Sequence, residues 1–295
     1  MLVWGSSFIL IKKSLIYFNA IEVGLLRISI TFLFLLPFAL VKLSTIDKKH
    51  AKYLIISGII GSLIPAFLFS IAQTGISSSL AGILNALTPL FTLVLGLLFF
   101  KLRSKWYNAI GVFIGLVGAI GLIYVSSGSQ GFVFNIKYAS LVIIASVCYG
   151  FNVNFIKLYL QKLDSLTITA FTFFYIGIPS LIYVIIFSDI PNKLINEKSA
   201  MTGLGYVSIL SIVGTGIALI VFNKLIKISS PVFASSVTYI IPIVAIIWGI
   251  IDGEIFRLSY IIWFSLIVLG VFLVNAKTGS YANLSSRLLF GKRKK

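Results

Sequence analysis

Long apolar blocks recur along the whole chain, and they constrain its fold more than any other feature of the sequence. Residues 20–41 carry only Glu22 and Arg27 as charged side chains, and residues 110–125 carry none. As an α-helix, a block of about 20 apolar residues matches the roughly 30 Å hydrocarbon core of a bilayer. The blocks do not alternate with polar residues, as the strands of a transmembrane barrel would. The sequence therefore predicts an all-α integral membrane protein.

About ten apolar segments can be separated at charged residues or at Gly, Pro and Asn breaks. The connections between them are short, and no stretch is long enough to form a soluble domain. The predicted membrane spans cover residues 1–18, 21–42, 52–73, 77–100, 106–125, 138–158, 166–187, 202–222, 231–251 and 258–275.

The positions of the basic residues predict an orientation. Lys and Arg are retained on the cytoplasmic side of a membrane. If the N-terminus is inside, the inner segments hold most of the 24 basic residues. We therefore expect both termini to be cytoplasmic and the protein to lie in the cytoplasmic (cell) membrane. In a soluble protein, a net charge of +17 would suggest binding to nucleic acid. Here the basic residues lie in short loops and the tail, so no nucleic-acid partner is expected.

Two pairs of stretches are repeated within the chain. SSSLAGILNALTPLFTLVLG at 77–96 resembles SPVFASSVTYIIPIVAIIWG at 230–249, which lies 153 positions later. WGSSFILIK at 4–12 returns as YGFNVNFIK at 149–157, with the aromatic residue, Gly and Lys in register at an offset of 145. Chance similarity among apolar helices is the alternative interpretation.

The repeats divide the chain into two five-helix units, residues 1–130 and 131–276, followed by a basic tail at 277–295. Because five is odd, the second unit must cross the membrane in the opposite sense, which makes an inverted-topology repeat. More apolar residues precede Tyr149 than precede Trp4. The first span is therefore either short or truncated at its start.

The linkers that follow the fourth segment of each unit have opposite charge. KLRSK at 101–105 is basic, whereas DGEIFR at 252–257 begins with Asp252 and Glu254. Equivalent linkers of inverted repeats face opposite sides of the membrane, and the cytoplasmic side favours basic residues. The charge difference therefore supports the inversion.

Each unit carries a proline within its fourth apolar segment. A proline inside a helix leaves the carbonyl four residues earlier without its usual partner, and lipid cannot satisfy that carbonyl. Such a group must face protein or a water-filled cavity, and inverted-repeat transporters bind substrate near this depth. Structural kinks, with the carbonyls satisfied by neighbouring Ser or Thr, are the alternative. The predicted cavity residues are Asn85, Thr88 and Pro89 in the first unit and Thr238, Tyr239 and Pro242 in the second.

Other polar residues within the apolar segments have two interpretations. Ser7, Asn152 and Asn154 either hydrogen-bond across helices or line the cavity. Arg27 lies roughly two turns, or about 9 Å, into its segment, where a guanidinium is costly unless it is paired or hydrated. It could hold a carboxylate substrate or bond to backbone carbonyls. We count all four among the candidate cavity residues.

The sequence offers little for catalysis. No Asp or Glu lies in the middle of an apolar segment, so a central carboxylate proton carrier is not expected. The single cysteine, Cys148, and the loop residue His50 cannot assemble a metal site or a redox pair. We expect no cofactor, no metal and no catalytic group. The alternative function, an integral-membrane lipid-modifying enzyme, usually needs a cluster of His, Cys or acidic residues at a membrane face.

Several stretches together resemble the EamA-type branch of the drug/metabolite transporter superfamily. They are WGSSFILIK, LLRISITFLFLLP with Arg27, the two proline segments, GVFIGLVGAIGL and LIVLGVFLVN. The resemblance covers nearly the whole chain and implies ten helices in two inverted repeats around a central cavity. It also implies an exporter or exchanger of a small metabolite, such as an amino acid, that works by alternating access. The expected partners are a small-molecule substrate and the lipid bilayer, and a homodimer is left open. The family usually has an acidic residue after the fourth span, where this chain has Lys101; only Glu254, in the second unit, fits that pattern.

Overall fold

The computed structural model describes residues 2–43, 46–101, 106–127, 132–254 and 257–275. Within these residues all regular secondary structure is helical. Seven helical runs are long and apolar enough to cross a membrane, and shorter apolar helices cover Ile110–Val125 and Ser259–Leu273. The predicted all-α fold is confirmed, and each of the predicted spans falls on a helix. The number of crossings and the side on which the termini lie stay predictions.

The helices follow the order expected for two units. The first unit contains α1 (Leu2–Ser14), α2 (Ala20–Val41), α3 (Lys48–Gly58), the π-helical turn η2 (Ile59–Leu63), α4 (Ile64–Ala72), α5 (Ser78–Asn85), α6 (Thr88–Phe99) and α7 (Trp106–Ser127). The second contains α8 (Phe132–Tyr159), α9 (Ser165–Ile186), α10 (Ile190–Asn196), α11 (Lys198–Ser211), the π-helical turn η4 (Ile212–Ile217), α12 (Ala218–Ile228), α13 (Pro231–Ser236), the 3₁₀ turn η5 (Val237–Ile240), α14 (Ile241–Ile251) and α15 (Ser259–Asn275). Helix α10 lies between the predicted spans 166–187 and 202–222, where only a connection is expected.

Equivalent helices of the two units begin with the same kind of cap. The side chain of Asn19 accepts a hydrogen bond from a backbone N–H at the start of α2, and Asp164, 145 positions later, does so at the start of α9. Ser77 caps α5, and Ser230, 153 positions later, caps α13. Such a cap satisfies one of the N–H groups that the first turn of a helix leaves unpaired. The duplication therefore extends to the residues that start the helices.

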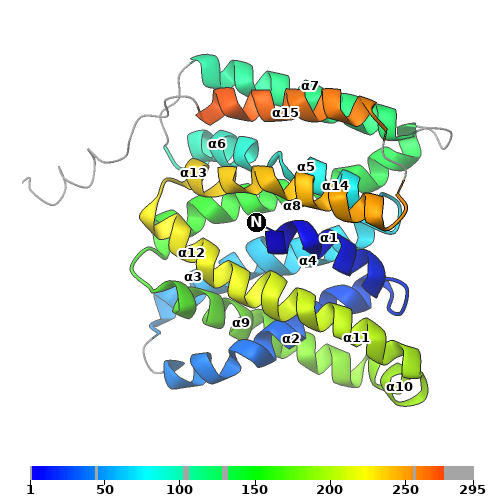
Figure 1. Cartoon of the computed structure of the whole chain (residues 1–295). Helices are drawn as coiled ribbons and strands as arrows, with labels where there is room; N and C mark the ends of the chain where they lie inside the picture. Colours follow the sequence, from blue (N-terminus) through cyan, green and yellow to red (C-terminus); the bar gives the residue numbers. More distant parts are fainter. Residues whose placement is uncertain (1, 44–45, 102–105, 128–131, 255–256, 276–295) are drawn as a thin grey trace, which may run out of the picture.

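The helices pack with the pseudo-symmetry of an inverted repeat. Helix α7 packs against its counterpart α15, and α2 packs against its counterpart α9, at opposite edges of the bundle (Figure 1). Helix α8 contacts α4 and α6, and its counterpart α1 contacts α11 and α14. The start of the fourth segment, α5, lies against α14, while its end, α6, lies against α13. The two proline segments therefore run antiparallel, and the expected inversion is confirmed for them.

The charge argument from the linkers can be followed at their described residues. Lys101 follows α6 and Asp252 follows α14. Because these two segments are antiparallel, Lys101 and Asp252 lie at opposite ends of the bundle. Residues 102–105 and 255–256, which complete the linkers, lie outside the described residues.

The α7–α15 pair is held by close backbone contact. A Cβ atom built on Gly270 would lie 2.5 Å from the backbone nitrogen of Gly115 and 2.6 Å from the carbonyl oxygen of Gly111. At Gly118 it would lie 2.9 Å from the backbone nitrogen of Ile267. Small residues allow membrane helices to approach in this way. The glycines of GVFIGLVGAIGL therefore form a packing face.

Candidate substrate cavity

The sequence predicted that each of the two prolines lies inside a continuous helix. This prediction is wrong, because each proline lies in the first turn of a new helix. Helix α5 ends at Asn85 and α6 begins at Thr88, with Pro89 in its first turn. In the second unit α13 passes through η5 into α14, which has Pro242 in its first turn. A proline is well tolerated in a first turn because no N–H donor is needed there. Each fourth segment is therefore two short helices joined at a break.

The backbone at the two breaks is already hydrogen-bonded. The Asn85 carbonyl accepts a bond of 2.8 Å from Thr88 Oγ1, and the Thr238 carbonyl accepts one from the Ile241 N–H. At Asn85 the alternative interpretation, a carbonyl satisfied by a neighbouring Thr, is therefore confirmed, and the Thr238 carbonyl pairs with the backbone instead. The side chains of Asn85 and Thr238, rather than their carbonyls, supply the polar groups at the breaks.

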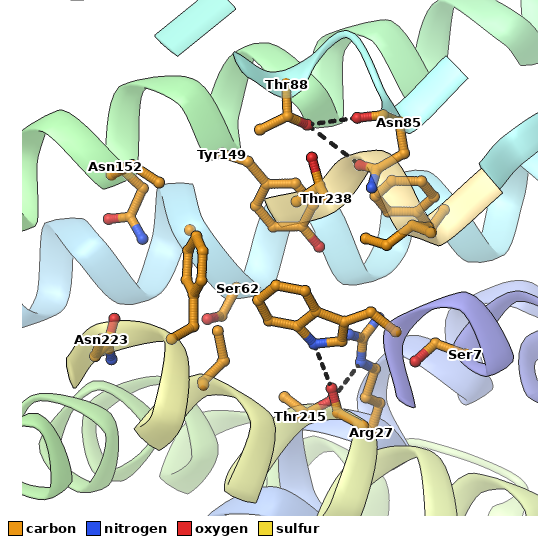
Figure 2. A pocket seen from close by; sticks show the side chains of 18 of the residues that line it. Ser7, Arg27, Ser62, Asn85, Thr88, Tyr149, Asn152, Thr215, Asn223 and Thr238 are labelled. Atoms are coloured by element: carbon orange, nitrogen blue, oxygen red, sulfur yellow. Dashed lines mark hydrogen bonds between the residues drawn. The ribbon is translucent and has the colours of Figure 1, made fainter. Parts of the chain in front are cut away.

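A cavity of about 100 Å³ lies between the two units, and Figure 2 shows its wall. A volume of roughly 10–15 Å³ holds one water, so this cavity is large enough for several waters or a small molecule. The predicted residues that line it are Ser7, Arg27, Asn85, Thr88, Asn152 and Thr238.

The other four predicted residues lie outside the cavity wall. Pro89 and Pro242 are buried at the starts of α6 and α14. Tyr239 packs against the main hydrophobic core. Asn154 donates hydrogen bonds of 2.8 Å to the Thr92 carbonyl and 2.9 Å to the Gly150 carbonyl, so it joins α8 to α6. The aromatic residues Trp4 and Tyr149, which the repeat pairs, also line the cavity.

Most lining residues come in pairs that are equivalent in the two units. The pairs 145 positions apart are Trp4 and Tyr149, Ser7 and Asn152, Phe8 and Val153, Ile11 and Ile156, and Ile28 and Phe173. The pairs 153 positions apart are Gly61 and Gly214, Ser62 and Thr215, Phe69 and Phe222, Asn85 and Thr238, and Thr88 and Ile241. The cavity is thus built twice from one pattern, with different side chains in the two copies.

The two π-helical turns occupy equivalent positions in the cavity wall. A π-turn inserts an extra residue into a helix, often at a functional site, and it frees backbone carbonyls from their usual partners. In η4 Thr215 Oγ1 donates to the Leu210 carbonyl at 3.0 Å, and Thr31 Oγ1 in α2 donates to the Ser211 carbonyl at 3.0 Å. The pattern of apolar segments did not predict these turns. The recurrence of a Gly followed by a hydroxyl residue at 61–62 and 214–215 is the signal that could have found them.

Gly61 in η2 makes room for a polar side chain of α8. A Cβ atom at Gly61 would lie 1.9 Å from Asn152 Nδ2, so the amide of Asn152 rests on the bare backbone of the π-turn. Asn152 Oδ1 accepts a hydrogen bond of 2.8 Å from Ser57 Oγ. The amide is thereby held in one orientation at the edge of the cavity.

Two aromatic contacts frame the cavity. The rings of Trp4 and Phe222 meet edge to face with centroids 4.9 Å apart. The equivalent pair, Tyr149 and Phe69, is stacked at 5.9 Å. Phe222 lies in α12, the second half of its membrane segment. Phe69 lies near the end of α4, the second half of the equivalent segment. Because the units are inverted, the two contacts lie toward opposite ends of the cavity.

Arg27 supplies the charge of the cavity. Its Nε donates a hydrogen bond of 2.9 Å to Thr215 Oγ1 (Figure 2). The residues found to line the cavity include no Asp or Glu. Among the described residues, no carboxylate lies within ion-pair distance of Arg27. The hydroxyl of Tyr149 points toward the side of the cavity that holds this guanidinium (Figure 2).

An ion-pair cluster lies at the C-terminal end of α1. Lys12 Nζ lies 2.7 Å from Asp252 Oδ2 and 2.9 Å from Glu254 Oε1. Lys13 also pairs with Asp252. The side chain of Glu254 is only 7% exposed, so its charge depends on these partners. The cluster fastens the end of α14 to the end of α1.

The same glutamate caps α5. Its carboxylate accepts hydrogen bonds from the backbone N–H groups of Ser78, at 2.9 Å, and Ser79, at 3.1 Å, and from Ser79 Oγ at 2.7 Å. A carboxylate at a helix N-terminus satisfies unpaired N–H groups and the helix dipole together. Glu254 therefore ties together the three segments α1, α5 and α14 at one end of the bundle.

The equivalent position in the other unit is held differently. Lys157, the counterpart of Lys12, donates to the carbonyls of Ile226 at 3.1 Å and Lys227 at 2.8 Å. The counterpart of Glu254 is Lys101, which has the opposite charge. The two equivalent ends of the bundle are thus held differently, by ion pairs at Lys12 and by hydrogen bonds to backbone carbonyls at Lys157.

The ion cluster predicts a dependence of stability on pH. Burial alone would raise the pKa of Glu254, but hydrogen bonds from Ser79, Lys12 and Ser78 outweigh it, and the pKa lies below its ordinary value. A carboxyl group whose pKa is lowered by folding stabilises the protein above its unfolded pKa of about 4.3. That stabilisation is lost as pH falls through the folded pKa. We expect the thermal unfolding midpoint of the wild type to fall more steeply between about pH 5 and pH 3 than that of Glu254→Gln. Parallel curves for the two proteins would contradict this expectation.

Comparison with known proteins identifies the family. The model of the EamA-like transporter family matches residues 1–124 and again residues 136–276. The chain belongs to the EamA-like transporter family. It is therefore a multi-pass membrane protein, and the resemblance stated from its motifs is confirmed.

Several relatives of this EamA-like protein carry transporter names. An "Uncharacterized transporter" of Archaeoglobus fulgidus is 24% identical over 276 residues, which cover 93% of this chain and 95% of that protein. The "Uncharacterized inner membrane transporter YedA" of Escherichia coli K12 is 26% identical over 95% of this chain and 89% of its own length. A solved crystal structure has the same fold, with a TM-score of 0.65 at 17% identity over 98% of this chain and 95% of that chain. The chain is thus a membrane transporter by family.

Proposed function

We propose that this protein moves a small polar or amphipathic metabolite across the cell membrane by alternating access, as an exporter or an exchanger. The observation that carries the proposal is the cavity lined by equivalent residues of both inverted units. In a transporter of this design, the two units exchange conformations around a fixed site at their interface. The proposed orientation places both termini in the cytoplasm, and the proposed partners are the substrate and the bilayer.

The two aromatic contacts support gating, in which the cavity opens at one end at a time. The Trp4–Phe222 and Tyr149–Phe69 contacts lie on either side of the cavity. Each contact joins a side chain of the first unit to one of the second, so it can separate when one unit moves relative to the other. The π-turns and the proline breaks interrupt the regular helix hydrogen bonding beside the cavity. Such interruptions are where a membrane helix bends at low cost.

Substitution of Asn85 by leucine tests the cavity as the transport site. Leucine keeps a similar bulk and removes the amide. Loss of the one or two hydrogen bonds that the amide makes to a ligand lowers the affinity by about ten-fold. We expect Asn85→Leu to lower counterflow of the substrate in proteoliposomes by at least about ten-fold. Counterflow measures exchange between the two sides and needs no knowledge of energy coupling.

The matched control is Ser236→Leu. Ser236 lies in the same proline segment as Thr238, but its hydroxyl donates to the Phe233 carbonyl at 2.8 Å, and it does not line the cavity. We expect this variant to retain transport. Unchanged transport in Asn85→Leu at normal membrane abundance would remove Asn85 from the site.

We also infer that the protein is not an enzyme. The family model and the relatives that match this chain are named as transporters. The alternative, a lipid-modifying enzyme, would form product from labelled lipid precursors without counterflow. Measuring both reactions on one reconstituted preparation distinguishes the two functions.

A further inference from the structure

The charge on the cavity wall comes from one unit only. The counterpart of Arg27 in the second unit is Thr172, a neutral residue that does not line the cavity. A side chain needed by the fold itself would be expected in both copies, as the paired glycines at 61 and 214 are. The guanidinium is therefore better explained by what the cavity binds than by how the bundle packs.

The wall offers a cation but no anion. Arg27 uses Nε for Thr215 and also interacts with the hydroxyl of Tyr149, and its two terminal nitrogens still carry further N–H groups that can meet a ligand. A guanidinium presents such N–H groups in a planar fork that matches the two oxygens of a carboxylate. Within the described residues, the cavity lining holds no carboxylate that could pair with an ammonium group.

The rest of the wall fits an apolar body. Trp4, Phe69, Phe173 and Phe222 contribute aromatic surface, and Ile28 lies next to Arg27 in α2. Two donors complete the polar side, the hydroxyl of Tyr149 and the amide of Asn85 (Figure 2). A ligand that meets these groups together has a planar oxyanion at one end and an apolar, ring-sized body at the other.

We propose that the substrates are amphipathic organic carboxylates, and that an amino group on the substrate is not required. The proposal rests on the proposed transport function and names the substrate class of the same cavity. Arg27 holds the carboxylate through two parallel N–H···O bonds, and the aromatic pairs at either end cover the apolar body. A bound anion also pairs with the guanidinium. Without such a partner, a buried guanidinium within the membrane is energetically unfavourable.

The test uses four probes that share one phenyl group. They are 3-phenylpropionate, phenylalanine, 3-phenylpropanamide and phenethylamine, which carry a carboxylate, a carboxylate with an ammonium group, a neutral carboxamide and an ammonium group, respectively. Binding is measured by thermal shift of the detergent-solubilised protein, and transport is measured by inhibition of counterflow. We expect 3-phenylpropionate to bind at least about ten-fold more tightly than the amide or the amine, as a charge-assisted bidentate pair implies. Phenylalanine should bind no more tightly than 3-phenylpropionate.

Three variants separate substrate binding from a structural role of Arg27. Arg27→Gln should abolish the preference for 3-phenylpropionate over the amide. Thr215→Val removes the acceptor of Nε and keeps the charge, so it should retain the preference. Arg27→Lys keeps a positive charge without the fork, so it should retain part of the preference, and it serves as the readout if Arg27→Gln does not fold.

The outcomes are distinct from those of the transport proposal. Tight binding of phenethylamine, a requirement for the amino group of phenylalanine, or an unchanged carboxylate preference in Arg27→Gln would each overturn the inference. Carboxylate binding that depends on Arg27, without counterflow of any probe, would uphold the ligand class and contradict the transport function.

Discussion

Glu254→Ala is expected to loosen one end of the cavity and to lower the free energy of unfolding by about 3 kcal/mol. The wild-type carboxylate pairs with Lys12 and accepts three hydrogen bonds from Ser78 and Ser79. Its removal leaves two backbone N–H groups of α5 without a cap and leaves Lys12 with Asp252 alone. Loss of a helix cap costs about 1 kcal/mol, and loss of one partner from a largely buried ion pair costs more.

The local part of this effect can be measured by thiol labelling. With Cys148→Ser as background, Asn85→Cys places a reporter in the cavity wall, and a membrane-impermeant reagent is added from each side in turn. We expect Glu254→Ala to increase the labelling rate from the side at which Glu254 lies. Glu22→Ala is the matched control, because Glu22 also caps a helix and pairs with a lysine, Lys193, yet takes no part in the ion-pair cluster of Lys12, Asp252 and Glu254. It should lower stability without changing the labelling. Equal labelling rates in the two variants would contradict the assignment of Glu254 to the closure of the cavity.

Gly270→Leu is expected to separate α7 from α15 and to lower the free energy of unfolding by about 3 kcal/mol, at the upper end of typical overpacking effects. The first atom of any side chain at this position would lie within 2.6 Å of backbone atoms of Gly111 and Gly115. Backbone cannot turn aside as a flexible side chain can, so one helix must move. Unfolding of the purified protein in denaturant gives the change in stability.

A second glycine provides the control for this change. Gly205 lies in α11, and a Cβ atom there would meet nothing within 4 Å. Gly205→Leu should therefore be neutral or slightly stabilising, since leucine is the better helix former. Neither α7 nor α15 contributes a residue to the cavity lining, so ligand affinity of the folded Gly270→Leu protein should be unchanged. Similar stability of the two variants would show that the α7–α15 contact is looser than described.

The architecture could be predicted because it depends on lengths and repeats along the chain. Apolar blocks of membrane-spanning length require helices, since a backbone in lipid must satisfy its own hydrogen bonds. The odd number of spans in each unit requires inversion. The glycines at 111, 115 and 118 predict close packing because their spacing brings them to one helix face.

The candidate site could be predicted only in part. Polar residues such as Asn85, Asn152 and Thr238 stand out in apolar helices, and they do line the cavity. Asn154 is equally polar, but its face of α8 meets α6. The aromatic residues Phe69 and Phe222 gave no signal, because phenylalanine is common in every segment. A helix that is apolar on all sides does not indicate which face meets lipid, a neighbouring helix or a cavity.

The sequence by itself determined that the chain is a bundle of membrane helices in two inverted units, because helix length, hydropathy and repetition are properties of the chain read in order. Only the tertiary structure decided that the prolines begin new helices, that the π-turns enter the cavity wall, and that Lys12 meets Glu254, 242 residues away. These features depend on which helix faces meet, and that is fixed by side-chain packing between segments distant in sequence. The role proposed for Arg27, the charged residue of the cavity wall, likewise depended on knowing which groups surround it.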